Sequence, residues 1–161
     1  MVSTCIFIYL SYNILINIFR SFHAKNRDLI CRQKVGNMKK ELLDILKKIT
    51  PEEEQYLGGR DQVRTEFYTE AMGGQFIVDS SKLLDKGRLI ELRPHTRFVH
   101  FPRHRHNYVE LVYMCSGSTT HIINDKETIV LKEGDLLFLN QNATQEILPA
   151  AESDIAVNFV I

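Results

Sequence analysis

Apolar residues in the second half of the chain fall into short runs that turn-forming residues interrupt. Glycine and asparagine occupy several of the breaks, for example at Gly117, Asn124 and Gly134. Short strands at close and regular spacing are typical of an all-β sandwich or barrel. The runs that we predict as strands are Leu89–Leu92, Phe98–Phe101, Tyr108–Cys115, Thr119–Ile123, Glu127–Leu131, Leu136–Asn140, Gln145–Leu148 and Ile155–Ile161. We therefore expect a mainly β chain with a barrel over residues 88–161.

The stretch before the barrel has a helical period. Between Lys39 and Ile49, apolar side chains recur at the spacing of one helix face, and charged side chains lie mostly on the other face; a second short helix is expected to run to Leu57. Thr50 suits an N-cap, Pro51 suits the first helical position, and Glu53 completes a capping box. We expect an N-terminal helical arm that packs on the barrel.

Two segments show no clear period. Residues 60–87 are rich in polar and turn residues, so we expect irregular structure there with one extended piece at Gln75–Val78. Cys5–Phe19 is apolar but shorter than the roughly 20 residues that cross a bilayer. Three interpretations of residues 1–37 stay open: a short membrane anchor, a partner-binding or core helix, or a stretch outside the native protein, which would then begin at Met38. The chain thus divides into an apolar and basic extension (1–37), a helical arm with an irregular segment (38–87), and the barrel (88–161).

Composition narrows the class of protein. With 44% apolar and 25% charged residues, the chain has the mix of a globular domain. Cys5, Cys31 and Cys115 form neither a disulfide framework nor a zinc pattern, so we expect a reducing cytoplasm. Basic residues are in excess before residue 50 and acidic residues after it, and a mildly acidic barrel is no electrostatic platform for DNA. The sequence indicates no clear membrane partner.

The residues that carry chemistry lie between His104 and Glu110. In a regular strand, residues of one parity share a face, so His104, His106 and Glu110 would point to the same side. Val112 and Met114 have the same parity, which indicates that this side is the barrel interior. Two neutral imidazoles and a carboxylate can bind a divalent metal, and they can equally hydrogen-bond a polar ligand.

This stretch resembles the first sequence motif of the cupins. That motif, His-x-His-x3-Glu-x6-Gly, is met in full by His104, His106, Glu110 and Gly117. The second cupin motif begins here at Gly134 and then drifts, because Asn140 and Asn142 stand where Pro and Gly would be, and Gln145 stands where the fourth metal ligand, His, would be. The resemblance implies a cupin-like double-stranded β-helix, or jelly-roll barrel, and it weakens the case for a metal.

Within the cupins, the chain is most similar to the N-terminal sensing domain of AraC-type transcription regulators. The similarity rests on the His-x-His opening, on Glu110-Leu111-Val112-Tyr113 in the next strand, and on the Gly134-Asp135-Leu136 turn. It implies a pocket for a small molecule, often a sugar, whose signal passes to a C-terminal pair of helix-turn-helix motifs. No such motifs occur in the sequence, so we expect a truncated sensing domain that would meet DNA only through an absent half. Dimers are common in that family, so a homodimer is a further expectation.

We predict that the polar side chains facing the barrel interior bind a ligand. The predicted ligand-binding residues are His104, His106, Tyr108, Glu110 and Arg97. A metal-dependent cupin enzyme, such as an isomerase or dioxygenase, is the alternative, and its metal ligands would be His104, His106, Glu110 and Gln145. A third interpretation is a buried polar cluster with a structural role only. Because no nucleophile pairing, phosphate loop or Ser-centred elbow occurs, we expect no catalytic residue, no enzyme and no cofactor other than the alternative metal.

Overall fold

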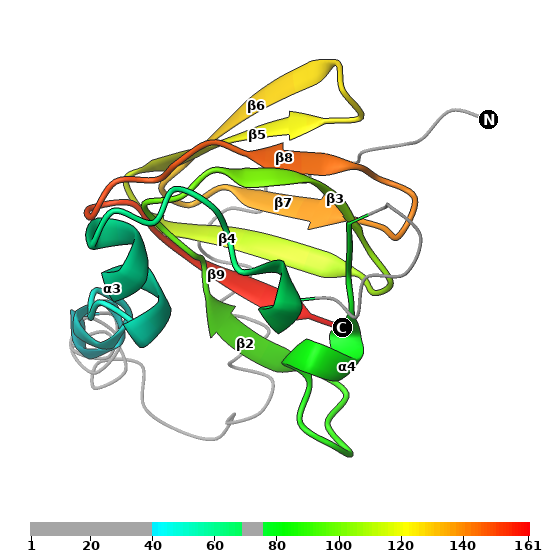
Figure 1. Cartoon of the computed structure of the whole chain (residues 1–161), viewed down its shortest axis with the longest axis horizontal. Coiled ribbons are helices and arrows are strands. Elements are labelled where there is room, and N and C mark those ends of the chain that lie inside the picture. Colours follow the sequence, from blue (N-terminus) through cyan, green and yellow to red (C-terminus); the bar gives the residue numbers. More distant parts are fainter. Residues whose placement is uncertain (1–39, 69–75) are drawn as a thin grey trace, which may run out of the picture.

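A computed structural model of the chain describes residues 40–68 and 76–161. The predictions for residues 1–37 therefore lie outside the described residues. The ordered elements are a helical turn at 40–46, α3 (Pro51–Leu57), η1 (Thr65–Phe67), β1 (Ile77–Val78), α4 (Ser80–Leu83), β2 (Glu91–Pro94), β3 (Phe101–His106), β4 (Glu110–Ser116), β5 (Ser118–Ile123), β6 (Glu127–Lys132), β7 (Leu136–Leu139), β8 (Gln145–Ile147) and β9 (Ile155–Val160) (Figure 1). Within the described ranges, no helix has the length and apolar character needed to cross a bilayer.

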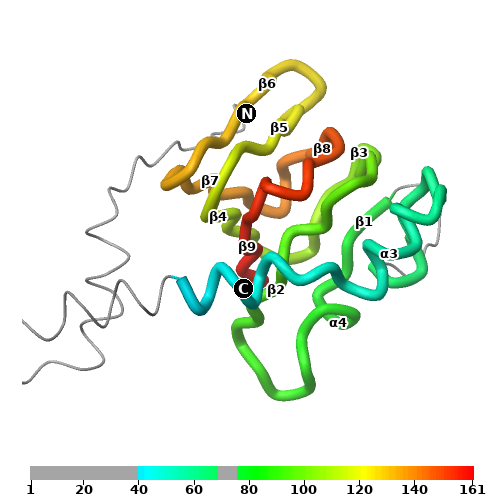
Figure 2. The backbone as a smooth tube through the Cα atoms, turned by 90° about the vertical axis from the view of Figure 1, so that its left-hand side faces the viewer, coloured from blue at the N-terminus to red at the C-terminus, as the bar shows by residue number. Residues whose placement is uncertain are grey.

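Two sheets face each other and enclose the core, as Figure 2 shows. One sheet has the strand order β1-β3-β8-β5-β6, and the other has the order β2-β9-β4-β7. All pairings are antiparallel except the one between β1 and β3. The chain crosses between the sheets after every strand from β1 to β8 except β5. This alternation is the topology of a double-stranded β-helix, and it confirms the predicted jelly-roll barrel.

The predicted strands overlap the observed ones, with one clear shift. Phe98 has a φ of 68°, which is unusual for a residue other than glycine, and β3 begins only at Phe101. The prediction of a strand from Phe98 was therefore wrong, because the chain turns at this point before it enters the sheet. The segment 60–87 also holds more structure than we predicted. The short helix α4 begins there, capped by the side chain of Asp79, which accepts a hydrogen bond from the Ser81 N–H at 2.8 Å.

Side chains alternate between core and surface along the strands, as the sequence pattern predicts. On β4, Val112 and Met114 are completely buried between the sheets. They belong to an apolar cluster with Leu137, Leu139 and Ala156 from the neighbouring strands β7 and β9. A second apolar cluster lies toward α3 and α4. The two apolar clusters leave a polar region of the interior around the histidines.

The helical arm packs against the barrel. Thr50 caps α3 with the predicted capping box, in which its side chain and that of Glu53 each accept a hydrogen bond from the other residue's backbone N–H. Before it, Leu43 and Leu46 of the turn at 40–46 pack on the outer face of the four-stranded sheet, close to Tyr113. The predicted contact between arm and barrel is therefore present, and it brings the first turn of α3 to one end of the sheets.

Candidate functional site

A cavity of about 270 Å³ lies between the sheets at the end of the barrel that α3 approaches. Both sheets contribute polar side chains to its wall. These are His104 and His106 from β3, Glu110 from β4, Asn158 from β9, Arg93 from β2, and His95, Thr96 and Tyr108 from the connections. Four of the five residues that we predicted to bind ligand thus line one cavity, and all four are buried.

The two histidines and the glutamate do not share a strand, contrary to the argument from parity. His104 and His106 lie on β3 in the five-stranded sheet, whereas Glu110 lies on β4 in the four-stranded sheet. The chain crosses between the sheets at residues 107–109. The three side chains still converge, because the inner faces of the two sheets point at each other. The prediction of one interior wall holds for a different geometric reason than the one assumed.

Burial keeps the two histidines and the glutamate of this wall uncharged. His104 donates a hydrogen bond from Nδ1 to the Pro102 carbonyl oxygen at 2.7 Å, and burial lowers the pKa of its imidazole to about 4. Burial also lowers the pKa of His106 well below its usual value. Burial raises the pKa of Glu110 to about 8, although the N–H donated by Asn158 works in the opposite direction. At neutral pH these three groups therefore stay mostly uncharged.

Asn158 and His95 belong to the site, and we did not predict either of them. The Asn158 side chain donates from Nδ2 to Glu110 Oε1 at 3.1 Å, and its Oδ1 accepts from His95 Nδ1 at 3.1 Å. Glu110 in turn lies 3.4 Å from His106 Nε2 through its Oε2. A signal for Asn158 was present in the sequence: it is the one polar residue in the apolar run Ile155–Ile161, at the parity that faces the interior. His95 carried no comparable signal.

Gln145 stands apart from this cavity. It pairs with His104 in the register of β3 and β8, and its side-chain Nε2 lies 2.7 Å from His121 Nδ1. His121 Nε2 donates to the Thr119 hydroxyl at 2.9 Å, so the pair forms a buried internal contact. Gln145 does not line the cavity wall.

The donor set does not fit a divalent metal ion. Within residues 40–68 and 76–161, no group of three or more His, Cys, Asp or Glu side chains is arranged to hold one. Burial favours the protonated form of Glu110, and its Oε1 already accepts a hydrogen bond from Asn158, so this carboxyl is a poor metal ligand. Gln145, the predicted fourth ligand, is engaged by His121. The geometry thus lends no support to the predicted metal ligands.

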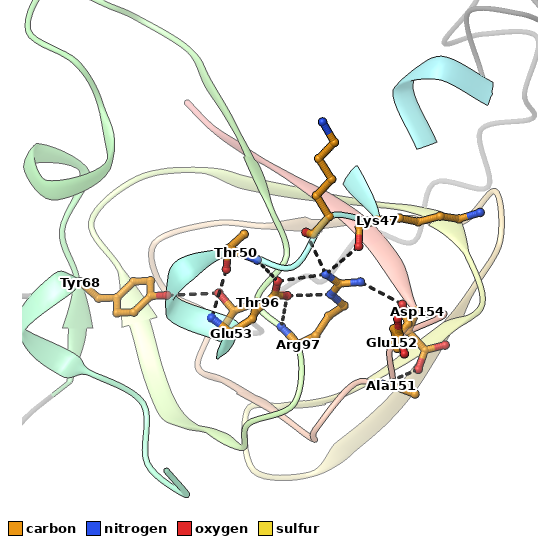
Figure 3. A network of polar contacts seen from close by, with 10 residues as sticks. Lys47, Thr50, Glu53, Tyr68, Thr96, Arg97, Ala151, Glu152 and Asp154 are labelled. Atoms are coloured by element: carbon orange, nitrogen blue, oxygen red, sulfur yellow. Dashed lines mark hydrogen bonds and ion pairs between the residues drawn. The ribbon is translucent and has the colours of Figure 1, made fainter. Parts of the chain in front are cut away.

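Arg97 has a different role from the one that we predicted. Its side chain is buried against Glu53 of α3, with Nε donating to Oε1 at 2.7 Å and Nη2 to Oε2 at 3.0 Å (Figure 3). Nη1 donates to the Glu152 carbonyl oxygen, and Nη2 also approaches the carbonyl oxygens of Lys47 and Lys48. The guanidinium does not line the cavity. It fastens the arm to the barrel instead of gripping an anionic ligand.

The arm also closes one side of the cavity. Thr50, Pro51, Glu52 and Glu53 line it together with the barrel residues. The carboxylate of Glu52 accepts hydrogen bonds from the hydroxyls of Tyr56 and Tyr68, and the Tyr68 hydroxyl also lies 3.2 Å from Thr96 Oγ1. The strands of the barrel therefore form one part of the cavity wall, and the start of α3 forms the other part.

The fold and the cavity define a cupin-type barrel with a polar interior pocket. Residues 88–159 match a family model described as the AraC-like ligand binding domain. This stretch, which spans the barrel and none of the arm, is therefore an AraC-like ligand-binding domain of the cupin type. A search of curated proteins finds no match to the chain.

Several solved structures are similar to this chain. An RmlC-like cupin family protein with a double-stranded β-helix fold from Methanocaldococcus jannaschii is 27% identical, with a TM-score of 0.36, over 44% of this chain and 64% of that one. A cupin protein from Bacteroides fragilis is 24% identical, with a TM-score of 0.34, over 44% and 63%. The DMSP lyase DddQ from Ruegeria pomeroyi is 14% identical, with a TM-score of 0.38, over 44% and 36%. The chain covers less than two thirds of each of these three structures.

Proposed function

We propose that the barrel and its arm form the small-molecule sensing part of an AraC-type transcription regulator in the cytoplasm. The match of residues 88–159 to the AraC-like ligand binding domain supports the class. Control of transcription would then pass through a helix-turn-helix region that is not among these residues. A regulator of this kind can also act as a homodimer.

One observation carries the proposal: the cavity wall is shared between the arm and the barrel. Glu52 of α3 faces the same cavity as His106 and Glu110. A ligand in this cavity would contact both parts, so it would favour the arrangement in which the arm is docked. Such a differential affinity is what shifts a two-state equilibrium. Ligand binding would thereby shift the equilibrium of the arm toward its docked position.

The cavity favours a small and uncharged ligand, of which a sugar is an example. Its volume of about 270 Å³ lies just below the roughly 300–1,000 Å³ that is typical of ligand pockets, so it suits a small molecule. Its wall offers imidazole, carboxyl, amide and hydroxyl groups and the guanidinium of Arg93, and burial favours the uncharged form of Glu110. The neutral imidazole, amide and carboxyl groups around His95, His104 and Glu110 suit hydroxyls better than phosphates or carboxylates.

Thermal unfolding in the presence of candidate ligands tests this proposal. We expect at least one neutral pentose or hexose to raise the melting temperature by several degrees at saturation, because a ligand that binds only the folded state stabilises it by mass action. Parallel samples would contain Mn²⁺, Fe²⁺, Ni²⁺ or Zn²⁺, each with an EDTA control. Stabilisation by a metal alone, reversed by EDTA, with no effect of any sugar, would contradict the proposal and favour the metal-dependent enzyme.

A further inference from the structure

His95 stands in the cavity wall with one of its two ring nitrogens unused. The residue follows β2, and its backbone N–H donates to the Ala156 carbonyl oxygen at 3.0 Å, so its position is tied to β9. Its side chain is 4% exposed and lines the cavity. Among the described residues, Nε2 is buried and has no hydrogen-bond partner. Buried polar atoms are nearly always paired, so an unpaired one calls for an explanation.

The hydrogen bond to Asn158 decides which nitrogen carries the proton. Asn158 Nδ2 donates to Glu110, so its Oδ1 is the atom that meets His95 Nδ1. Because an amide oxygen can only accept, the proton of the neutral imidazole must lie on Nδ1. Burial lowers the pKa of His95 and thus favours the neutral ring. His95 Nε2 therefore carries a lone pair and no hydrogen.

His104 shows the same arrangement from the opposite sheet. Its Nδ1 donates to the Pro102 carbonyl oxygen, which leaves Nε2 of the neutral ring as a second acceptor. By contrast, His121 uses both ring nitrogens within the protein, on Gln145 and on Thr119. Two cavity histidines are thus held as acceptors by fixed partners on their other nitrogen.

We propose that His95 is a ligand-recognition residue that accepts, at Nε2, a hydrogen bond from an O–H or N–H group of an uncharged ligand. Asn158 is its positioning residue, because it fixes the ring and its tautomer. His104 Nε2 supplies the second acceptor. The inference rests on the proposed ligand-binding function and extends it to residues outside the cupin motif. It also selects the ligand group that meets the two histidines, since a carboxylate or phosphate there would bring a further acceptor toward two lone pairs.

Glycerol is a suitable probe, because it is small, uncharged and carries three hydroxyl donors. The histidine side chains would be labelled with nitrogen-15 and their ring signals followed by NMR. We expect His95 and His104 to show protonated Nδ1 and bare Nε2, and we expect glycerol to shift both Nε2 signals in a saturable way. Glycerate, its carboxylate analogue, should leave both signals in place.

Variants at position 95 separate recognition from folding. His95→Asn keeps a group that can bond Asn158 but removes the acceptor at the Nε2 position, whereas His95→Gln keeps an acceptor there. With the His104 Nε2 signal as the readout, we expect His95→Asn to bind glycerol about tenfold more weakly, as for the loss of one hydrogen bond. His95→Gln should retain most of the affinity.

Variants at position 158 test the positioning role. Asn158→Leu should produce a mixture of His95 tautomers, and Asn158→Asp, which keeps an acceptor for Nδ1, should preserve the single tautomer. A protonated Nε2 on His95 in the wild-type protein would overturn the inference, and so would equal glycerol binding by His95→Asn and the wild-type protein. If sugars stabilise the wild-type protein but substitution of His95 leaves the affinity for glycerol unchanged, only this inference fails. If no sugar stabilises it, the proposed function fails separately.

Discussion

At the scale of single residues, burial decides what the cupin motif does in this chain. Glu110 is 3% exposed and has a single amide donor, Asn158, in hydrogen-bond distance among the described residues. A carboxylate in such a place loses more hydration than one amide restores, so the protonated form is favoured. The motif residue that would carry a negative charge toward a metal is thereby turned into a neutral hydrogen-bonding group.

The substitution Glu110→Gln tests this neutral state. Burial raises the pKa of Glu110 from 4.5 to about 8, so above pH 4.5 the unfolded state releases a proton that the folded state retains. The native carboxyl therefore lowers the free energy of unfolding progressively from pH 4.5 to about 8, by up to about 3 kcal/mol at neutral pH. Glutamine removes this penalty and keeps the acceptor for Asn158. We expect the variant to be more stable than the wild-type protein, increasingly so toward pH 8, in urea unfolding. If the Glu110→Gln variant were instead less stable than the wild-type protein at pH 8, the native carboxylate would be ionised and paired.

At the scale of elements, a buried ion pair joins the arm to the barrel. Arg97 and Glu53 have side-chain exposures of only 3% and 2%. Burial alone would raise the pKa of Glu53, but the hydrogen bonds from Arg97 and the Thr50 N–H outweigh it and hold that pKa below its usual value. Leu43 and Leu46 add apolar contacts on the outer face of the sheet. These contacts, together with the packing of Tyr56 of α3 in the core, set the position of α3 and of one side of the cavity.

Removing one partner of this pair should release the arm. We expect Arg97→Met to lower the free energy of unfolding by about 3–5 kcal/mol, because it leaves the Glu53 charge buried without a partner. Faster limited proteolysis near Lys47 and Lys48 should accompany this loss. The double variant Arg97→Met/Glu53→Gln removes the charge and keeps the capping-box acceptor, so it should regain much of the stability.

A surface pair provides the matched control for this experiment. Arg64 donates to Glu66 at 2.8 Å, and these side chains are 30% and 56% exposed. Exposed pairs contribute about 0–1 kcal/mol, so Arg64→Met should change the free energy of unfolding little. An effect of Arg97→Met no larger than that of Arg64→Met would mean that the buried pair does not hold the arm.

At the scale of the whole molecule, the barrel holds four buried histidines in its polar interior. They are His95, His104, His106 and His121, and burial lowers the pKa of each. His95 and His121 rings lie 5.7 Å apart, and those of His104 and His106 lie 4.8 Å apart. Adding a proton to one of them therefore disfavours adding a proton to its neighbours. Burial and the closeness of the rings therefore both favour the neutral form of these imidazoles.

Mild acid should therefore unfold the domain. Each unfolded histidine binds a proton below pH 6.5, whereas folded His104 does so only near pH 4. The stability that these groups contribute is fully present above pH 6.5 and is lost as the pH falls toward 4, by about 3 kcal/mol for His104 alone. Above pH 4.5, Glu110 has the opposite effect, because its raised pKa lowers the free energy of unfolding as the pH rises. This is one group against four histidines, so the effect of the histidines should dominate. We expect the melting temperature to be highest near neutral pH and to fall steeply below about pH 6. A flat profile from neutral pH down to pH 4.5 would contradict the neutral interior.

The local pattern of the sequence was sufficient for the strands and for one wall of the cavity. Alternation and turn residues depend only on near neighbours in the chain, so the strands, the capping box at Thr50 and the inward direction of His104, His106 and Tyr108 could be predicted. The AraC-like character of the barrel was also carried by local motifs, and the match of residues 88–159 agrees with it.

Only the tertiary structure decided which distant residues meet. His95 reaches Asn158 across 63 positions of the chain, and Arg97 reaches Glu53 across 44. Their spacing in the sequence carries no signal of these contacts, because they depend on which strands pair and where α3 docks. In the same topology, Gln145 lies outside the cavity wall and its side chain forms a hydrogen bond with His121. The sequence thus determined the barrel and the polar residues that face inward, and the tertiary structure determined the partners that keep those residues neutral.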